Sequence, residues 1–221
     1  MTIVAHSLGK TLGNPARQIL SDISCTINDG DFLAITGRSG SGKSTLLYVL
    51  STLDQPSIGS LVIDGKETTQ MERAEIYHLR NEKIGFVFQF HYLLPELNAL
   101  ENVLMPARKN GITDKHTERA HDLLRGFGMI DKVGRRPSQL SGGEQQRVAI
   151  ARALVMEPRY IFADEPTGSL DSENSRKVMD ILQAANSERG ATLVLVTHEP
   201  DYAKQARSEI ILVDGRIVDQ R

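Results

Sequence analysis

Apolar and polar positions alternate along the chain in a way that predicts both strands and helices. Short apolar stretches between turn residues fill positions 1–36 and are typical of β-strands. Apolar runs at 160–163 and 192–197 are each followed by a stretch with helical spacing, and the chain ends in a hairpin pattern at 209–218. Strands that alternate with helices in this way indicate an α/β fold with a parallel sheet.

Residues after about Gln89 break this alternation. Strand patterns disappear there, and helical spacing follows, most clearly at 114–128. We therefore expect a helical insertion between two parts of the α/β core.

The composition excludes several classes of protein. The 221 residues include 26 Lys and Arg against 28 Asp and Glu, so there is no general basic surface and we expect no nucleic-acid partner. Cys25 is the only cysteine, which rules out an intrachain disulfide, and its strand-like neighbours predict a buried position. No apolar run approaches the roughly 20 residues that span a bilayer, and the N-terminus lacks a signal-peptide pattern. Contact with a membrane would therefore need a partner.

A phosphate-binding motif follows the third predicted strand. Its G-x-x-x-x-G-K-[ST] pattern is complete, with a strand before it and a helix after it. Glycines let successive backbone N–H groups turn inward, and a helix N-terminus favours an anion. We expect the β- and γ-phosphates of a nucleotide at Lys43 and Mg²⁺ at the Ser44 hydroxyl. The alternative is a Gly- and Ser-rich connector with an incidental lysine, and both flanks argue against it. The residues expected to bind the nucleotide are Gly37, Arg38, Ser39, Gly40, Ser41, Gly42, Lys43, Ser44 and Thr45.

Two carboxylates end the strand predicted at 160–163. Asp164 is expected to hold the Mg²⁺ shell, as an Asp after an apolar strand does in phosphate-loop NTPases. Glu165 points differently and is placed to polarise an attacking water. Alternatively, the two carboxylates cap the next helix, but the phosphate motif favours the metal and water roles.

Gln89 and His198 also stand at the ends of apolar runs. If their strands neighbour the strand of the phosphate loop, both side chains face the γ-phosphate. Gln can coordinate metal or water there, and His can hydrogen-bond the phosphate and orient Glu165. A lone Gln or His at a strand end is otherwise a surface termination.

A second site suited to an anion begins at Ser141. Ser141, Gly142 and Gly143 start a predicted helix and expose backbone N–H groups, while Ser141 and Glu144 match a capping box. The chain therefore contains two candidate phosphate sites that are far apart in sequence.

These motifs, taken in order, resemble the nucleotide-binding subunit of ABC transporters over nearly the whole chain. They are the phosphate loop, Gln89, LSGGEQQR at 140–147, FADEP at 162–166, SLD at 169–171 and His198. LSGGE is diagnostic of that family. The resemblance implies an α/β fold with a P-loop NTPase core of ABC type, an N-terminal antiparallel β subdomain and an inserted α-helical subdomain. It also implies a single domain over 1–221, in which 1–88 and 155–221 hold the nucleotide-binding core with the β subdomain, and 89–154 hold the helical subdomain with the signature.

The same resemblance implies an ATPase that uses ATP and Mg²⁺ and forms a head-to-tail homodimer with two ATP molecules at the interface. One subunit would close its Ser141, Gly142, Gly143 and Glu144 over the γ-phosphate held by the other. The implied catalytic residues are Glu165, His198 and Gln89, and the implied metal ligands are Ser44, Gln89 and Asp164. Gln89 would begin a link to the helical insertion, which in the family receives a short helix from an integral membrane subunit.

The stretch GFVFQFHYLLPELNALENVLMP at 85–106 narrows the resemblance to one branch. That branch contains the lipoprotein-releasing ATPase LolD, the macrolide exporter MacB and the division ATPase FtsE, and LolD is the most similar. It implies permease subunits with an extracytoplasmic domain and a peripheral location at the cytoplasmic face of the inner (plasma) membrane. Efflux of a macrolide or peptide, or mechanotransmission in cell division, is the alternative. A soluble, non-transport ABC ATPase is disfavoured by the single cassette and the absence of sustained heptads.

The chain departs from the family in one respect. Family members commonly stack adenine on an aromatic residue near the N-terminus, but there is no Phe, Tyr or Trp between Met1 and Asp31. His6 is the nearest ring, and Lys10 or Leu12 lie nearer the expected place. Because stacking contributes about 1 kcal/mol, we expect weaker selectivity for the base.

Overall fold

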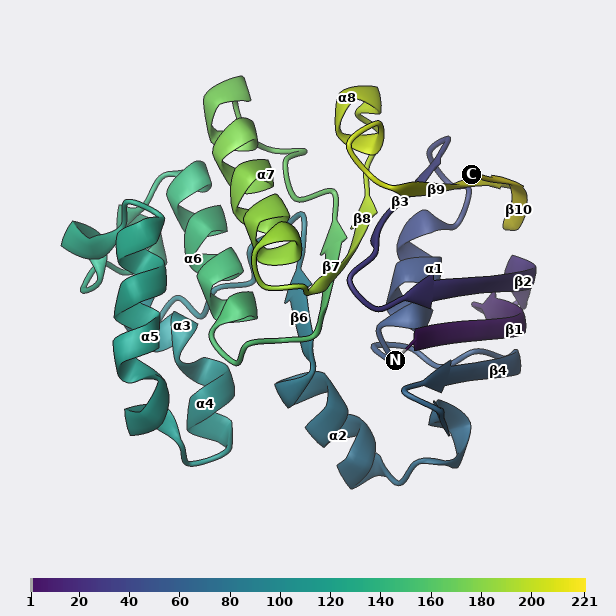
Figure 1. Cartoon of the computed structure of the whole chain (residues 1–221), viewed down its shortest axis with the longest axis horizontal. Helices are drawn as coiled ribbons and strands as arrows, with labels where there is room; N and C mark the ends of the chain where they lie inside the picture. Colours follow the sequence, from purple (N-terminus) through teal and green to yellow (C-terminus); the bar gives the residue numbers. More distant parts are fainter. Residues whose placement is uncertain (1) are drawn as a thin grey trace.

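Two β-sheets and a layer of helices make up the molecule (Figure 1). The computed structural model describes residues 2–221. The central sheet has six strands in the order β10-β9-β3-β8-β7-β6, all parallel to their neighbours except β10. The second sheet has four antiparallel strands in the order β2-β1-β4-β5. Both the parallel core and the N-terminal antiparallel sheet predicted from the sequence are therefore present.

The strands follow the predicted apolar runs closely. Their bounds are β1 Thr2–Leu12, β2 Arg17–Asn28, β3 Phe32–Gly37, β4 Ile58–Ile63, β5 Lys66–Glu67, β6 Ile84–Val87, β7 Tyr160–Asp164, β8 Thr192–Val196, β9 Ser208–Val213 and β10 Arg216–Gln220.

The helices occupy the stretches with helical spacing. Their bounds are α1 Lys43–Leu50, α2 Arg73–Glu82, α3 Ala99–Val103, α4 Met105–Lys109, α5 Thr113–Gly126, α6 Gly142–Leu154, α7 Ser172–Ser187 and α8 Pro200–Ala203, with 3₁₀ turns at Thr68–Gln70, Ile130–Lys132 and Pro137–Gln139. The elements α3 to α6 all fall within 89–154, where the sequence predicts a helical insertion. The subdomain boundaries themselves stay a prediction.

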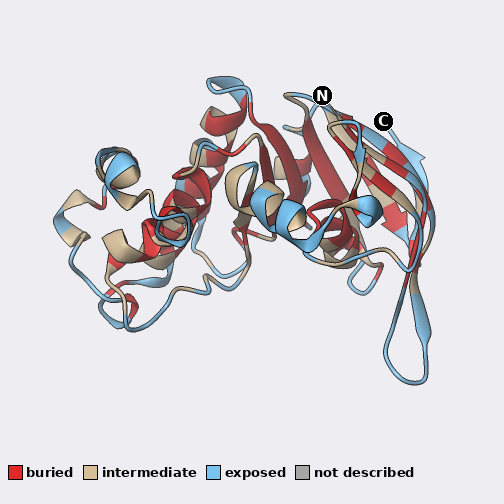
Figure 2. Ribbon diagram, turned by 90° about the horizontal axis from the view of Figure 1, so that it is seen from below, coloured by how far each residue is buried: buried red, intermediate tan, exposed pale blue. Residues whose placement is uncertain are grey.

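Alternating side chains of the central strands face two separate cores. On β8, Leu193 and Leu195 face a core formed with the helices α5, α6 and α7, whereas Val194 and Val196 face a core shared with α1 and the antiparallel sheet. Since successive residues of a strand point to opposite faces, a strand buried on both faces must be apolar throughout. The burial pattern makes this visible as uninterrupted buried strands in the centre of the molecule (Figure 2).

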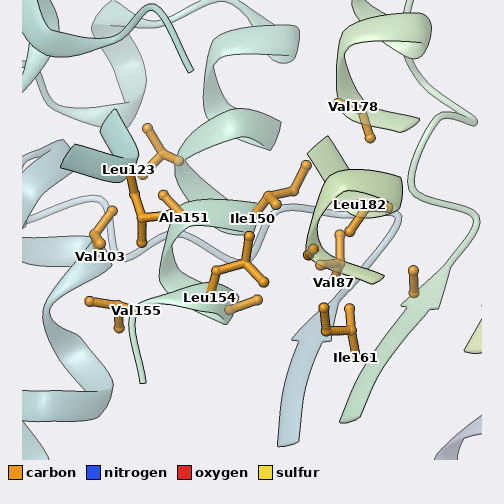
Figure 3. Packing of buried hydrophobic residues seen from close by; sticks show 14 of the residues in the cluster. Val87, Val103, Leu123, Ile150, Ala151, Leu154, Val155, Ile161, Val178 and Leu182 are labelled. Atoms are coloured by element: carbon orange, nitrogen blue, oxygen red, sulfur yellow. The ribbon is translucent and has the colours of Figure 1, made fainter. Parts of the chain in front are cut away.

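Helix α6 is the centre of the helical layer. It packs against α3, α5, α7 and β6, and its Ile150, Ala151 and Leu154 lie among the side chains of these neighbours (Figure 3). Small and large apolar residues alternate along it, so it is buried on most of its circumference. Tight packing on several sides makes α6 a rigid body rather than a loosely held surface helix.

Two composition-based expectations can be compared with the structure. Cys25 lies on β2 and is buried as predicted, and burial raises the pKa of its thiol to about 11. Among residues 2–221, none of the helices combines the length and the apolar character needed to cross a membrane.

A buried asparagine organises the chain between β6 and α3. Asn102 is fully buried, and its side chain accepts a hydrogen bond from the Leu94 N–H and donates to the carbonyls of Leu94, Leu97 and Asn98 at 2.7 to 3.1 Å. Asn98 and Glu101 form the capping box of α3. The motif at 98–102 therefore caps and anchors this helix.

Replacement of Asn102 by Ala should lower the free energy of unfolding by about 3 kcal/mol, because it removes several hydrogen bonds and leaves buried backbone groups without partners. Urea unfolding followed by circular dichroism measures the change. Asn110→Ala, at an exposed site with one long side-chain bond of 3.4 Å to Glu82, is the matched control and should change stability little. Equal losses in the two variants would contradict the anchoring role of Asn102.

Candidate functional site

The phosphate loop lies between β3 and α1 and opens into a cavity of about 660 Å³. Gly37 has φ 142, and a Cβ atom there would lie 2.2 Å from the Leu212 carbonyl oxygen, so only glycine allows the loop to pass β9. Gly42, at φ 100, stands at the N-cap of α1, and no side chain caps this helix. The amides of its first turn are therefore available to an anion.

The individual loop residues divide into those that line the cavity and those that hold the loop. Lys43 is 7% exposed, and its Nζ donates to the Arg38 carbonyl at 3.1 Å. Ser41 is buried, and its carbonyl accepts the Gly215 N–H at 3.0 Å, which fixes the loop to the β9–β10 turn. The loop residues that line the cavity are Ser39, Gly40, Gly42, Lys43, Ser44 and Thr45.

Asp164 meets the phosphate loop at the carboxyl end of β7. Its Oδ1 accepts a hydrogen bond from the Ser44 hydroxyl at 3.0 Å. Burial raises the pKa of Asp164 above its usual value, and the hydrogen bonds from Ser44 and Tyr48 oppose this shift only in part. A buried carboxylate next to a hydroxyl gains from a hard cation, which prefers oxygen ligands and can share them with phosphate oxygens. Ser44 and Asp164 therefore fit a Mg²⁺ ion that arrives with a nucleotide.

Glu165 directly follows Asp164, the last residue of β7. Its backbone has φ 44, an unfavourable value for a residue with a Cβ, and is held by the bond from its N–H to the Val196 carbonyl at 3.0 Å. Its Oε1 lies 3.5 Å from His198 Nδ1, and Glu165 lines the cavity. The next helix, α7, is capped by Asp171 instead, so helix capping does not explain either Asp164 or Glu165.

His198 and Gln89 follow strands that lie at different distances from the phosphate-loop strand in the sheet. The strand of His198, β8, pairs with β3, so the condition stated for His198 is met. The strand of Gln89, β6, pairs with β7 and is separated from β3 by two strands, so the condition is not met for Gln89. Gln89 still approaches the site, because a Cβ atom on Gly168 would lie 3.2 Å from Gln89 Nε2 and 3.6 Å from Glu165 Oε2.

The second candidate anion site lies outside this cavity. Ser141 caps α6, with the predicted capping box to Glu144 formed by bonds of 2.8 and 3.3 Å. Hydrogen bonds from Lys132 and from the Ser141 N–H hold the pKa of Glu144 below its usual range. Ser141 and Gly142 are exposed, and a Cβ on Gly142 would meet open space. None of the four residues 141–144 is among the described residues that line the cavity of the phosphate loop.

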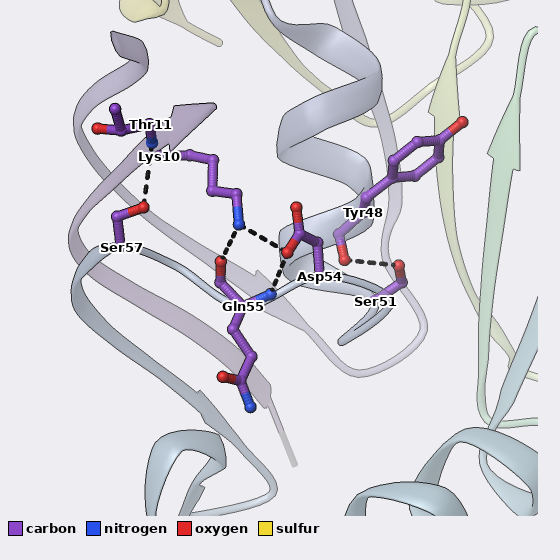
Figure 4. A network of polar contacts seen from close by, with 7 residues as sticks. All are labelled: Lys10, Thr11, Tyr48, Ser51, Asp54, Gln55 and Ser57. Atoms are coloured by element: carbon purple, nitrogen blue, oxygen red, sulfur yellow. Dashed lines mark hydrogen bonds and ion pairs between the residues drawn. The ribbon is translucent and has the colours of Figure 1, made fainter. Parts of the chain in front are cut away.

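The residues considered near the N-terminus for contact with a base lie away from the cavity. Lys10 is buried and bonds to Asp54 at 2.6 Å and to the Gln55 carbonyl at 2.7 Å, so it braces β1 rather than facing a base (Figure 4). His6 pairs with Ser60 inside the antiparallel sheet. Neither His6 nor Lys10 lines the cavity; the residues of β2 and of the β9–β10 turn that do so are Arg17, Gln18, Ile19, Asp214 and Gly215.

In the sequence, only the residue type of Arg17 suggests that it could contact a nucleotide base. A planar guanidinium can stack on an aromatic ring, and a nucleotide base is such a ring. Nothing in the sequence, however, places Arg17 beside the phosphate loop. It arrives there because β2 starts next to the β9–β10 turn, where the Ser21 N–H bonds to the Gly215 carbonyl at 2.8 Å.

Comparison with known proteins agrees with this geometry. A family model described as ABC transporter matches residues 20–168. The chain is 54% identical to a lipoprotein-releasing system ATP-binding protein LolD of Leptospira interrogans, over 98% of this chain and 90% of that protein. It is 49% identical to a macrolide export ATP-binding/permease protein MacB of Paracoccus denitrificans, over 95% of this chain but 31% of that protein. A bacterial ABC transporter cassette with a dimeric structure superposes with a TM-score of 0.91 at 38% identity, covering 99% of this chain and 97% of that one.

Replacement of Arg17 by Ala should weaken the binding of ADP and of GDP by a similar factor, about fivefold, because a guanidinium stacks on either purine. Isothermal titration with each nucleotide measures this. Arg216→Ala removes the same charge from an exposed residue beside the same turn, outside the cavity lining, and should leave both affinities unchanged. An equal loss in the two variants would show a general charge effect and contradict stacking on Arg17.

Proposed function

The chain belongs to the ABC transporter family and is an ATPase of that family. We propose that two copies pair head to tail around two ATP molecules and drive movement in membrane partner subunits. In this arrangement the phosphate loop of one copy holds the triphosphate. The start of α6 in the other copy, Ser141–Gly143, covers the γ-phosphate; we call these three residues the lid.

The observation that carries the proposal is the separation of the lid from its own cavity. The lid is a helix N-terminus with exposed Ser141 and Gly142, an arrangement that favours negative charge by up to about 2 kcal/mol when partly buried. Within one chain it has no nucleotide to contact, since, among the described residues, 141–144 neither line the cavity nor hydrogen-bond to a residue that does. A dimer provides that nucleotide from a second copy, and the dimeric cassette with which the chain superposes supports this arrangement.

The residues that line the cavity, and those that contact this lining, then take distinct roles. Lys43 and the first-turn amides of α1 bind the β- and γ-phosphates, and Ser44 and Asp164, together with Gln89, hold Mg²⁺. The ion neutralises charge on the phosphates. Glu165 accepts a proton from the attacking water, and His198, 3.5 Å from its carboxylate, orients Glu165 and bonds to the phosphate.

A surface beside Gln89 suits a partner protein. Phe90 and Tyr92 are 66% and 64% exposed, their ring centroids lie 6.4 Å apart, and we call these two residues the aromatic patch. Next to them is a cavity of about 310 Å³ lined by Phe86, Phe88 and Tyr92 from the Gln89 segment, and by Pro106 of α4 and Met156 after α6. Exposed aromatic side chains around a groove are typical of interaction sites. We assign this surface to a short helix of the membrane subunit, because it is continuous with Gln89.

Release of lipoproteins from the inner membrane is the favoured task. The relatives named LolD match across nearly their own full lengths, at 90% and 91% coverage with 54% and 52% identity. Efflux by a MacB-like complex is the second candidate, since that match is 49% identical. In either case the partners would be permease subunits with an extracytoplasmic domain, and the chain would lie at the cytoplasmic face of the membrane.

Replacement of Glu165 by Gln should give a chain that binds ATP, hydrolyses it at least about a hundredfold more slowly and accumulates as a dimer in the presence of ATP, because the water is no longer activated. Size-exclusion chromatography with light scattering measures the dimer. Adding Ser141→Arg should abolish that dimer while the monomer still binds ATP, since the arginine blocks only the partner's site. Loss of ATP binding by the monomeric double variant would contradict the two-chain site.

Replacement of Phe90 and Tyr92 together by Ser should release the chain from membranes that contain its permease subunits, because the aromatic patch loses most of its apolar area. Sedimentation of membranes followed by immunoblotting measures this. The control replaces Val213 and Val218 of the β9–β10 hairpin, which are 42% and 58% exposed, by Ser and should remain bound. Retention of the Phe90/Tyr92 variant would rule out this docking surface.

A further inference from the structure

Gln146 is a buried polar residue on the helix that carries the lid. It lies in the second turn of α6, and 1% of it is exposed. The other buried residues of α6 are Gly, Ala, Val, Ile and Leu. A glutamine in such a position needs an explanation beyond the volume that it fills.

The side-chain amide of Gln146 connects α6 to two loops of the hydrolysis site. Its Nε2 donates to the Phe88 carbonyl at 3.3 Å and to the Pro166 carbonyl at 2.9 Å. Phe88 immediately precedes Gln89, and Pro166 immediately follows Glu165. These loops leave the neighbouring parallel strands β6 and β7. One side chain therefore fixes the distance between the lid helix and both loops.

The amide oxygen of Gln146 has no such role. Its Oε1 is buried and has no hydrogen-bond donor within reach among the described residues. A buried acceptor without a donor is destabilising, and methionine has a similar shape without that penalty. Packing alone therefore does not favour glutamine here, and the two donated bonds, which tie the helix to both loops, account for its presence.

A second contact supports this connection. Arg147, the next residue, donates from Nη1 to Asn174 Oδ1 at 2.7 Å, and Asn174 in turn bonds to Asp171 at 2.7 and 2.9 Å. A Cβ atom on Gly143 would lie 2.5 Å from the Asn174 side chain. Gly143 of the lid thus lies against Asn174 in the first turn of α7, the helix that follows the loop from Glu165.

We propose that Gln146 is a positioning residue that transmits the nucleotide state of one chain, through the loops at Gln89 and Glu165, to the lid which that chain presents to its partner. The inference rests on the proposed two-chain site. Its consequence is that hydrolysis at one site moves the lid of the other site, so the two sites are coupled through the amide of Gln146.

Gln145 provides a matched control. It carries the same amide on the same helix, and its Nε2 also donates to two carbonyls, those of Pro137 at 3.0 Å and Leu140 at 3.1 Å. These carbonyls belong to the segment just before α6 and have no link to the sheet. Gln145→Met and Gln146→Met therefore remove equivalent bonds and differ in what the bonds connect.

The test has two readouts. Both variants should lose similar thermal stability and keep the ATP affinity of the monomer. Only Gln146→Met should lower kcat, by about tenfold, because a tenfold change corresponds to about 1.4 kcal/mol, the size of one hydrogen bond. The same variant should also reduce the Hill coefficient for ATP towards one. If Gln146→Met fails to fold, Gln146→Asn keeps the amide but is too short to reach both carbonyls, and the same result is expected.

Hydrogen exchange in a chain held monomeric by Glu165→Gln and Ser141→Arg gives the second readout. In this monomeric chain and in its Gln145→Met derivative, ATP should change the exchange of residues 88–94 and of residues 142–150. In the Gln146→Met derivative, ATP should change the exchange of residues 88–94 only. An identical response in all three would overturn the inference. Failure of the two-chain site would be recognised separately, as the absence of an ATP-dependent Glu165→Gln dimer.

Discussion

The carboxyl ends of the parallel strands all reach the same edge of the central sheet, and this constraint determines where the chemistry occurs. The phosphate loop leaves β3, Asp164 ends β7 and Glu165 follows it, and His198 follows β8. The strands β3, β7 and β8 are buried on both faces, so none of them can shift along its neighbours without exposing apolar side chains or burying polar ones. The 3.0 Å bond between Ser44 and Asp164 therefore joins residues that are 120 positions apart in the sequence.

The same architecture explains why one chain has two anion sites. The phosphate loop belongs to the central sheet, whereas the lid belongs to α6, which is packed among α3, α5, α7 and β6. In the proposed dimer the exposed N-terminus of α6 faces the nucleotide of the other chain, because it lies outside the cavity of its own chain. Gln146 and Arg147 connect this helix to the loops beside Gln89 and Glu165, so the lid can respond to the nucleotide state of its own chain.

Much of this site could be predicted from the sequence because each motif ends a recognisable apolar run. The proximity of Ser44 and Asp164, the capping box at Ser141 and the contact between Glu165 and His198 agree with what the motifs predict, whereas the metal and catalytic roles stay predictions. The position of β6 in the sheet could not be predicted, because strand order depends on how helices cross over the sheet. The contribution of Arg17 and Asp214 to the cavity lining was also out of reach, since the two residues come together only where β2 packs against the β9–β10 turn. Gln146 lies in a pattern typical of an amphipathic helix, and only its contacts distinguish it from Gln145.

The central claim is that the lid of one chain covers the nucleotide of another. Cysteine cross-linking between Ser39 in the cavity and Gly142 in the lid tests it most directly, because the native Cys25 is buried and 7% exposed. Chains that carry Glu165→Gln with either Ser39→Cys or Gly142→Cys are mixed with ATP and oxidised. The account predicts a cross-linked dimer that joins one chain of each kind and requires ATP. A chain that carries both cysteines and forms an ATP-dependent disulfide within itself, with no product of dimer mass, would contradict it.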